Sequence, residues 1–149
     1  MQRAEDGLGG CALPIALEAM GERWSFLILR ASLDGIEHFE DFQATLGIAR
    51  NILANRLSRL VSNGILSRER IEGDRRRVAY RLTPKGRDLL PAMIALRQWG
   101  ERWGGGPPCD RVLADARDHA PIRPIAIQAQ DGRTLGPDEI CWQLRDGCR

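Results

Sequence analysis

The sequence has four cysteines and two histidines, but no paired CxxC motif. The cysteines stand far apart, at positions 11, 109, 141 and 148, so neither a zinc site nor a disulfide framework is expected. No apolar run is long enough to span a bilayer, and the opening MQRAEDGLGG lacks the basic and apolar regions of a signal peptide. We therefore expect a cytoplasmic protein with reduced cysteines and no membrane association.

Catalytic motifs are also missing. The sequence contains no nucleophile elbow, phosphate-binding loop or zinc signature. His38 begins a predicted helix, where a capping or surface role is far more common than catalysis, and His119 has no evident partner. We expect no enzymatic activity, no metal and no cofactor.

Lysine is nearly absent, with one lysine against 21 arginines. Genome composition explains the choice of arginine over lysine, but it does not explain where the charge lies. Residues 1–46 carry a net charge of −5, residues 47–87 carry +8, and residues 88–149 carry −1. One strongly basic segment of this kind predicts contact with a polyanion.

The basic segment begins with an amphipathic helix, predicted over residues 50–62. Its apolar stripe consists of Leu53, Leu57, Leu60 and Val61. The opposite face has no carboxylate, and asparagine, arginine and serine are side chains that read base edges or allow close approach to them. The candidates for base readout are Asn51, Asn55, Ser58 and Arg59. Arg56 is expected near the edge of the core, paired with an acid such as Glu40 or Asp41.

The helix is preceded by another over residues 38–46, across Gly47-Ile48-Ala49, and is followed by a predicted β-hairpin. The hairpin has strands over residues 65–71 and 78–82 and a tip over residues 72–77. Helix, turn, helix and hairpin together predict an α+β fold, a winged helix-turn-helix. The 50–62 helix would enter the major groove, and backbone or minor-groove contacts would come from Arg50, Arg75, Arg76 and Arg77.

Apolar helices flank this unit. Residues 11–20 and 23–33 predict two helices, and residues 84–103 predict a long one that Pro91 bends or delays. The wide apolar face of the long helix either packs within the monomer or, as we favour, forms a homodimer contact shared with the first helix.

A linker, GGGPP at residues 104–108, separates the predicted domain 1–103 from a C-terminal extension, 104–149. Alternating Ile125, Ile127 and Ala129, the turn signal Asp131-Gly132 and a returning strand within residues 133–144 predict a small β appendage. A dimer clasp, an effector site and a cover for the core are all open roles for it.

Residues 11–103 resemble the HxlR-type bacterial transcriptional regulators. The resemblance is carried by Cys11 and by the segments RWSFLILR, HFEDF, LGIARNILANRLSRLVSNGIL, VAYRLTPKGRDLLP and QWGERW. It implies a homodimeric, cytoplasmic winged-helix protein that binds double-stranded DNA at promoters, most often as a repressor. The paired cysteines expected in the tail of other members are missing, so no metal is carried over.

Two positions bear on how far the resemblance extends. Some members use the N-terminal cysteine to sense electrophiles or oxidants, so Cys11 is either a redox-sensing residue or a buried structural one. Ala49 stands where the family often has a capping serine, so either Asn51 caps a slightly shorter helix or tertiary contacts hold its start. A small-molecule or electrophile effector is left open.

The leading hypothesis is a sequence-specific DNA-binding regulator. The alternative is a winged-helix module that binds protein, but such modules usually lose charge on the recognition helix and the wing. The +8 segment argues against that alternative.

Overall fold

The computed structural model describes residues 12–106 and 111–141, except for the side chains of residues 74–76. The contacts divide the chain into two compact units, Met1–Met93 and Ile94–Arg149. The domain boundary predicted at residue 104 therefore falls inside the second unit, and it stays a prediction. None of the helices in the described ranges is long and apolar enough to cross a membrane.

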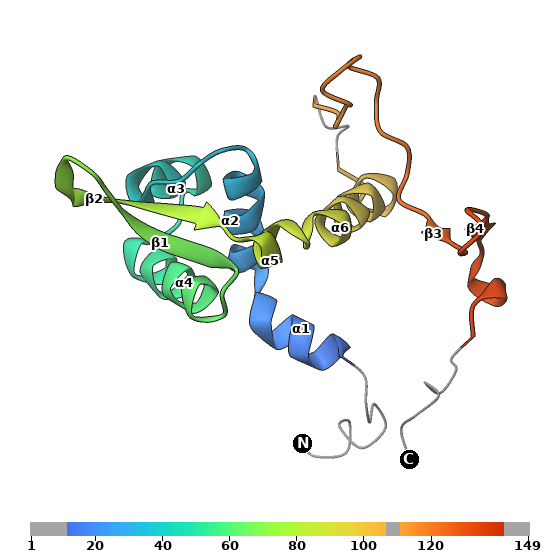
Figure 1. The fold of residues 1–149 in the computed structure, drawn as a ribbon, viewed down its shortest axis with the longest axis horizontal. Coiled ribbons are helices and arrows are strands. Elements are labelled where there is room, and N and C mark those ends of the chain that lie inside the picture. Colours follow the sequence, from blue (N-terminus) through green and yellow to red (C-terminus); the bar gives the residue numbers. More distant parts are fainter. Residues whose placement is uncertain (1–11, 107–110, 142–149) are drawn as a thin grey trace. The chain divides into compact units, whose positions relative to one another are not determined.

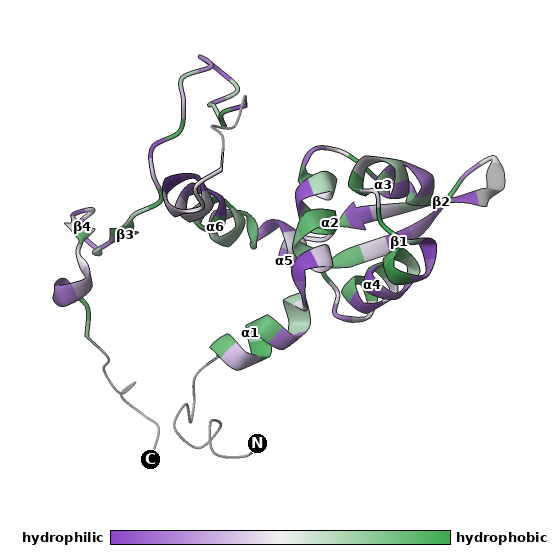
Figure 2. Cartoon of the chain, turned by 180° about the vertical axis from the view of Figure 1, so that it is seen from behind, coloured by the Kyte–Doolittle hydropathy of each residue, from purple (hydrophilic) through white to green (hydrophobic). Residues whose placement is uncertain are grey.

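The first unit is the predicted winged helix-turn-helix, an α+β fold (Figure 1). Its elements, in chain order, are α1 (Leu13–Met20), α2 (Arg23–Leu33), α3 (Phe39–Leu46), α4 (Arg50–Ser62), β1 (Leu66–Ile71), β2 (Asp74–Leu82) and α5 (Pro84–Arg87). In Figures 1 and 2, α3 and α4 lie on either side of the β1–β2 hairpin. The helix limits predicted for residues 50–62 are confirmed.

The core of this unit forms where α2, α3 and α4 meet. Phe42 from α3 and Ile28 from α2 are fully buried, and the leucine stripe of α4 packs against them. Burying each such side chain contributes roughly 1.5–3 kcal/mol, so the stripe fixes which face of α4 is turned outward. The turn between α3 and α4 is closed by Gly47, whose φ of 60° and ψ of 28° are left-handed.

The wing is a two-stranded antiparallel hairpin with an irregular end. Cα pairing runs from Leu66↔Leu82 to Arg70↔Val78 and then shifts to Ile71↔Asp74, so residues 75–77 have no partner on β1. The arginine run was predicted to lie in the connecting tip, and this is wrong, because β2 begins at Asp74 and the run forms a bulge within it. The alternation of apolar and polar residues that predicted the second strand begins at Val78, and regular pairing with β1 begins at the same residue.

A third segment, which the sequence did not predict, joins the wing. The backbone before α3 forms an isolated antiparallel bridge, His38↔Ala79, and the amide of Tyr80 donates to the carbonyl of Glu37 at 2.7 Å. These bonds attach β2 to the start of α3. The wing is therefore fixed to the helix-turn-helix at residues 78–80 of β2 as well as at its base.

The predicted helix start at Thr83-Pro84 is confirmed, since the hydroxyl of Thr83 accepts from the amide of Gly86 at 3.1 Å. The helix predicted over residues 84–103 is interrupted near Pro91, as the sequence predicts. It ends at Arg87 and resumes as α6 (Leu90–Trp103), because Pro91 has no amide hydrogen to continue the bonding.

The second unit begins within α6 and continues into the extension. Gln98 of α6 binds the extension through both ends of its amide, accepting from the amide of Ile125 at 2.7 Å and donating to the carbonyl of Arg123 at 3.3 Å. The predicted β appendage is present, but its strands β3 (Ile127–Gln128) and β4 (Thr134–Leu135) are shorter than expected. A short 3-10 helix, Pro137–Glu139, replaces the rest of the returning strand.

Gly86 provides a stability prediction. A Cβ there would lie 2.3 Å from the carbonyl oxygen of Ile65, which cannot move freely because it accepts from Thr83. We expect Gly86→Ala to lower the free energy of unfolding by roughly 1–3 kcal/mol, measured by urea denaturation. Gly100→Ala is the matched control, since no atom beyond its chain neighbours and the adjacent backbone of its own helix lies within 4 Å of its Cβ position. Equal stability of the two variants would contradict the close approach at Gly86.

Candidate nucleic-acid interface

The outward face of α4 is polar and free of carboxylates. Arg50, Asn51, Asn55 and Ser58 are exposed, whereas the leucines on the other side are 0–1% exposed. The amide oxygen of Asn55 accepts a hydrogen bond from Arg56 at 3.3 Å. Three of the four predicted readout residues, Asn51, Asn55 and Ser58, therefore share one accessible face.

The start of α4 is held by packing and has no side-chain cap. Ala49 has an extended backbone at the cap position, and the first helical residue is Arg50. Asn51 lies inside the first turn and so does not cap a shorter helix. Ile48, only 3% exposed, anchors the turn in the core just before the helix begins, in agreement with the alternative that tertiary contacts hold this end.

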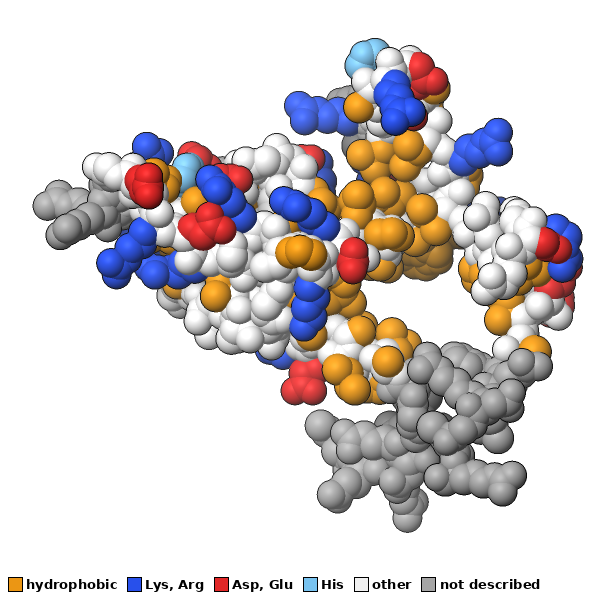
Figure 3. All heavy atoms as spheres, viewed as in Figure 1, with side chains coloured by type: hydrophobic (Ala, Val, Ile, Leu, Met, Phe, Trp, Pro, Cys, Tyr) orange, Lys and Arg blue, Asp and Glu red, His pale blue; other side chains and the backbone are white. Residues whose placement is uncertain are grey.

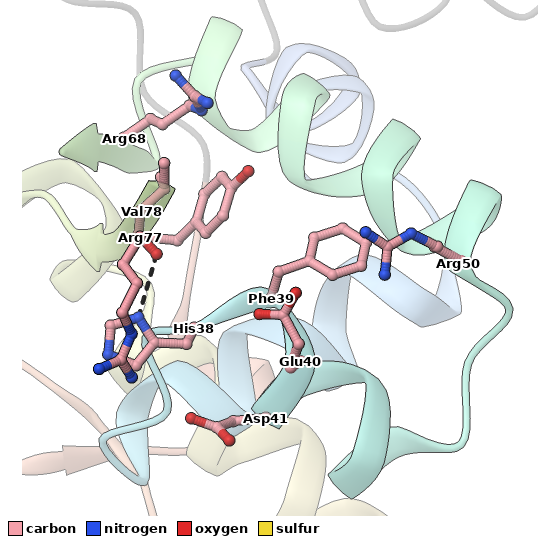
Figure 4. A pocket seen from close by; sticks show the side chains of 9 residues that line it. His38, Phe39, Glu40, Asp41, Arg50, Arg68, Arg77 and Val78 are labelled. Atoms are coloured by element: carbon pink, nitrogen blue, oxygen red, sulfur yellow. Dashed lines mark hydrogen bonds between the residues drawn. The ribbon is translucent and has the colours of Figure 1, made fainter. Parts of the chain in front are cut away.

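Arg50 is oriented by an aromatic ring. Its guanidinium carbon lies 4.8 Å from the centroid of Phe39, over the ring (Figure 4). A cation–π contact of this kind holds the side chain without neutralising its charge. The charge of Arg50 therefore remains available at the N-terminal end of α4, where the helix dipole is also positive.

A groove of about 500 Å³ lies between the beginning of α3, Arg50 and the wing (Figure 4). Arg68 of β1 and Arg77 of β2 line its wing side. His38 closes one end, with its Nδ1 3.1 Å from the carbonyl oxygen of Val78. The groove thus gathers three arginines, from α4 and from both strands of the wing.

Two carboxylates, Glu40 and Asp41, line the α3 side of the same groove. They belong to the first turn of α3, where the helix dipole stabilises negatively charged side chains. A polyanion would be repelled from this side and attracted to the arginine side. The charge distribution therefore restricts a phosphate chain to the α4 and wing side of the groove.

Arg68 was not among the predicted site residues. Arg68 and Arg70 alternate along β1 and so lie on one side of it, and this alternation was the available signal in the sequence. Only the pairing of β1 with β2, and the attachment of β2 to the start of α3, showed that Arg68 joins Arg50 and Arg77.

Arg59 was predicted to read bases, and the structure does not place it with the exposed row. It is half-buried, and its Nη2 donates to the backbone carbonyl of Glu18 at 2.7 Å. The acid expected to pair with Arg56, Glu40 or Asp41, was wrong. Arg56 pairs with an acid, but that acid is Glu22, at 2.8 Å, because this side of α4 faces α1 and α2.

Arg81 of the wing is paired with two carboxylates. Its Nε lies 3.1 Å from Glu37 and its Nη1 lies 3.1 Å from Glu69. The hydrogen bond from Arg81 to Glu37 and the charges of Glu37 and Glu69 raise the pKa of Arg81. Its charge is offset locally, so it adds little to the attraction of a polyanion.

Several predicted residues lie at or beyond the limits of the described structure. Arg75 and Arg76 belong to the bulged start of β2, and their side chains are outside the described part of the chain, as is Cys11. No group of three or more histidine, cysteine or acidic residues that could hold a metal occurs within the described ranges.

Solved structures resemble the chain closely. A crystal structure of PA1607, a proposed transcription factor, has a TM-score of 0.82 and 34% identity, covering 92% of this chain and 98% of that one. The redox regulator HypR in its reduced form has a TM-score of 0.58 and 28% identity, covering 62% of this chain and 93% of that one. The match with PA1607 thus includes most of the extension.

Sequence comparison agrees with the structural resemblance. Rv3095 of Mycobacterium tuberculosis (strain ATCC 25618 / H37Rv), named an HTH-type transcriptional regulator, is 41% identical over 113 residues, covering 74% of this chain and 72% of that protein. Residues 19–106 match the family described as HxlR-like helix-turn-helix. Together with the fold, these matches show that the chain is a transcriptional regulator belonging to the HxlR-like helix-turn-helix family.

Proposed function

We propose that the protein is a sequence-specific DNA-binding repressor that acts as a homodimer in the cytoplasm and has no enzymatic activity. The observations that carry this proposal are the carboxylate-free exposed face of α4 and the groove lined by Arg50 of α4 and by Arg68 and Arg77 of the wing. An exposed polar helix face and a groove lined by arginines offer both hydrogen bonding to base edges and attraction to phosphates.

In this proposal α4 enters the major groove. Asn51, Asn55 and Ser58 face the base edges, and an asparagine amide can pair bidentately with adenine. Arg59 is left out of the readout set because its guanidinium is bound to α1.

The wing follows the adjacent backbone or minor groove. Arg77 and Arg68 would neutralise phosphates together with Arg50, and Arg75 and Arg76 are included from the sequence. Each neutralised phosphate releases condensed counterions, which makes binding sensitive to salt.

The dimer proposal rests on apolar surfaces that each unit leaves exposed. Leu13, Ile15 and Leu17 of α1 are 51–71% exposed, and α1 is coloured mainly hydrophobic in Figure 2. Hydrophobic side chains also gather over α1 in Figure 3. A helix of eight residues without a buried side chain is marginal on its own, so covering it with a second copy would stabilise it.

In the second unit, α6 exposes Leu96, Trp99 and Trp103, which we also assign to the dimer contact. Two copies related by a twofold axis would present two α4 helices to half-sites about one turn of DNA apart.

The proposal includes an effector that controls DNA binding. HypR, to which the chain is similar, is named a redox regulator. We propose that an electrophile or oxidant acting at Cys11 is the signal to test first, by comparing DNA release in wild type and Cys11→Ser.

Salt dependence tests DNA binding itself. We expect wild-type binding to random duplex to weaken steeply with salt, and Arg77→Ala to reduce the slope of log K against log salt by about 0.9, since one phosphate contact is lost. Fluorescence anisotropy at several salt concentrations measures both. Arg30→Ala is the control, because it removes an equal charge from an exposed pair with Asp34 on α2. Binding of wild type without salt dependence would favour the protein-binding alternative.

Base readout is tested at Asn55. We expect Asn55→Ala to relax preference at one base position by about 1–3 kcal/mol, because the bidentate amide is removed. The measurement is selection of bound sequences from random DNA, followed by titration of single-base variants. Gln130→Ala, an exposed amide in the second unit, is the control. An equal loss on selected and random DNA would remove Asn55 from the readout residues.

The dimer is tested at Leu17, which is 51% exposed on α1. We expect Leu17→Glu to shift the protein from dimer to monomer in analytical ultracentrifugation, because the contact would bury an unpaired carboxylate. Ala44→Glu, which adds the same charge to an exposed position of α3, should leave the dimer intact. A monomeric wild type, or a dimeric Leu17→Glu, would contradict the proposed interface.

A further inference from the structure

The C-terminal end of α1 is capped by side chains from the recognition helix. Arg59 of α4 donates to the carbonyl of Glu18 at 2.7 Å, and Asn63, directly after α4, donates to the carbonyl of Ala19 at 3.0 Å. The carbonyls of the last turn of a helix have no partner within the helix. Here the amide of Gly21 donates to the carbonyl of Leu17, and Arg59 and Asn63 donate to the next two carbonyls.

A third contact extends this junction. Arg56 forms an ion pair with Glu22, between α1 and α2, at 2.8 Å. The arginine side chain is 18% exposed and the glutamate side chain 69%. Arg56, Arg59 and Asn63 are spaced by three and four residues, so they lie along one side of α4. That side adjoins the polar face and is directed at residues 18–22.

The charge of Arg59 has a particular effect at this position. It meets a backbone carbonyl in the last turn of α1, where the helix dipole is negative, and α1 itself has no basic residue in that turn. Arg59 therefore supplies from another helix the positive charge that the end of α1 lacks.

The junction is also closely packed. A Cβ at Gly21 would lie 3.1 Å from the hydroxyl oxygen of Ser25 and 4.0 Å from Nε of Arg59. Ser25 is completely buried. The space in which α1 could turn relative to α4 is therefore small, and the polar contacts define one angle between them.

From these contacts we infer that Arg59 and Asn63 are positioning residues that transmit the pairing of α1 in the dimer to the spacing of the two α4 helices. This inference rests on the proposed homodimer and its DNA binding. The exposed apolar side chains of α1 hold the partner, and its opposite end is fixed to α4. A rigid connection then makes the protein select operators by the distance between their half-sites, with no contact from Arg59 to DNA.

The test is a spacing series. Operators selected with wild type are rebuilt with zero, one, two and four base pairs inserted between the half-sites, and a single half-site is the reference. We expect wild type to lose about tenfold in affinity when two base pairs are inserted. The double variant Arg59→Ala/Asn63→Ala should lose less than about threefold, because α4 can then adjust relative to α1.

Three further variants separate the effect of the Arg59 and Asn63 contacts from a simple loss of charge. Arg59→Lys keeps a donor and a charge and should retain most of the spacing penalty of wild type. Asn63→Ala alone, which removes one hydrogen bond, should lower the penalty in the same direction as the double variant. Arg30→Ala, which removes an equal charge away from α1, should keep the wild-type penalty. All are compared by circular dichroism and by ultracentrifugation.

Affinity for the single half-site separates positioning from a structural role. It should stay within about twofold of wild type in every variant, because the readout face is unchanged. A loss of half-site affinity, a monomeric double variant, or an unchanged spacing penalty in both alanine variants would overturn the inference. If wild type binds DNA but shows no spacing preference, the inference fails while the proposed function stands. Wild-type binding without salt dependence would instead refute the proposed function.

Discussion

The burial of one leucine stripe governs the arrangement of the first unit. Leu53, Leu57 and Leu60 are almost inaccessible, and they pack where α2 and α3 meet α4. Because the three leucines occupy one side of the helix, its asparagine and serine side chains must face outward. The stripe thus sets the orientation of the candidate readout residues before any contact with DNA is made. The three leucines belong to the same buried cluster as the core residues of α2 and α3.

Six arginines of the basic segment whose side chains the structure describes form two groups with different tasks. Arg56, Arg59 and Arg81 are bound to protein groups and contribute to the internal structure. Arg50, Arg68 and Arg77 line an open groove. The same residue type serves both purposes because a guanidinium can either satisfy carboxylates and carbonyls or remain available to phosphates. Net charge alone, +8 over the segment, does not distinguish the groups.

The extension has its own local order. Gln98 binds its backbone, Asp131 accepts from Arg133 at the turn, and the hydrogen bonds from Arg133 lower the pKa of Asp131. These are short-range or surface contacts, and the extension residues are largely exposed, with several isoleucines among them. The alignment with PA1607 covers 92% of this chain, whereas the alignment with HypR covers 62%. PA1607 therefore matches residues of this chain that the alignment with HypR leaves out.

The sequence by itself determined that these helices and a hairpin are present, the turn at Gly47 and the limits of α4, because hydrophobic period and turn residues act over a few positions. It also determined that the exposed face of α4 lacks carboxylates. Only the tertiary structure decided the bulge at residues 75–77, the entry of Arg68 into the groove and the binding of Arg59 to Glu18. Arg59 and Glu18 are 41 positions apart, and such a pairing depends on how whole helices pack, which no local pattern encodes.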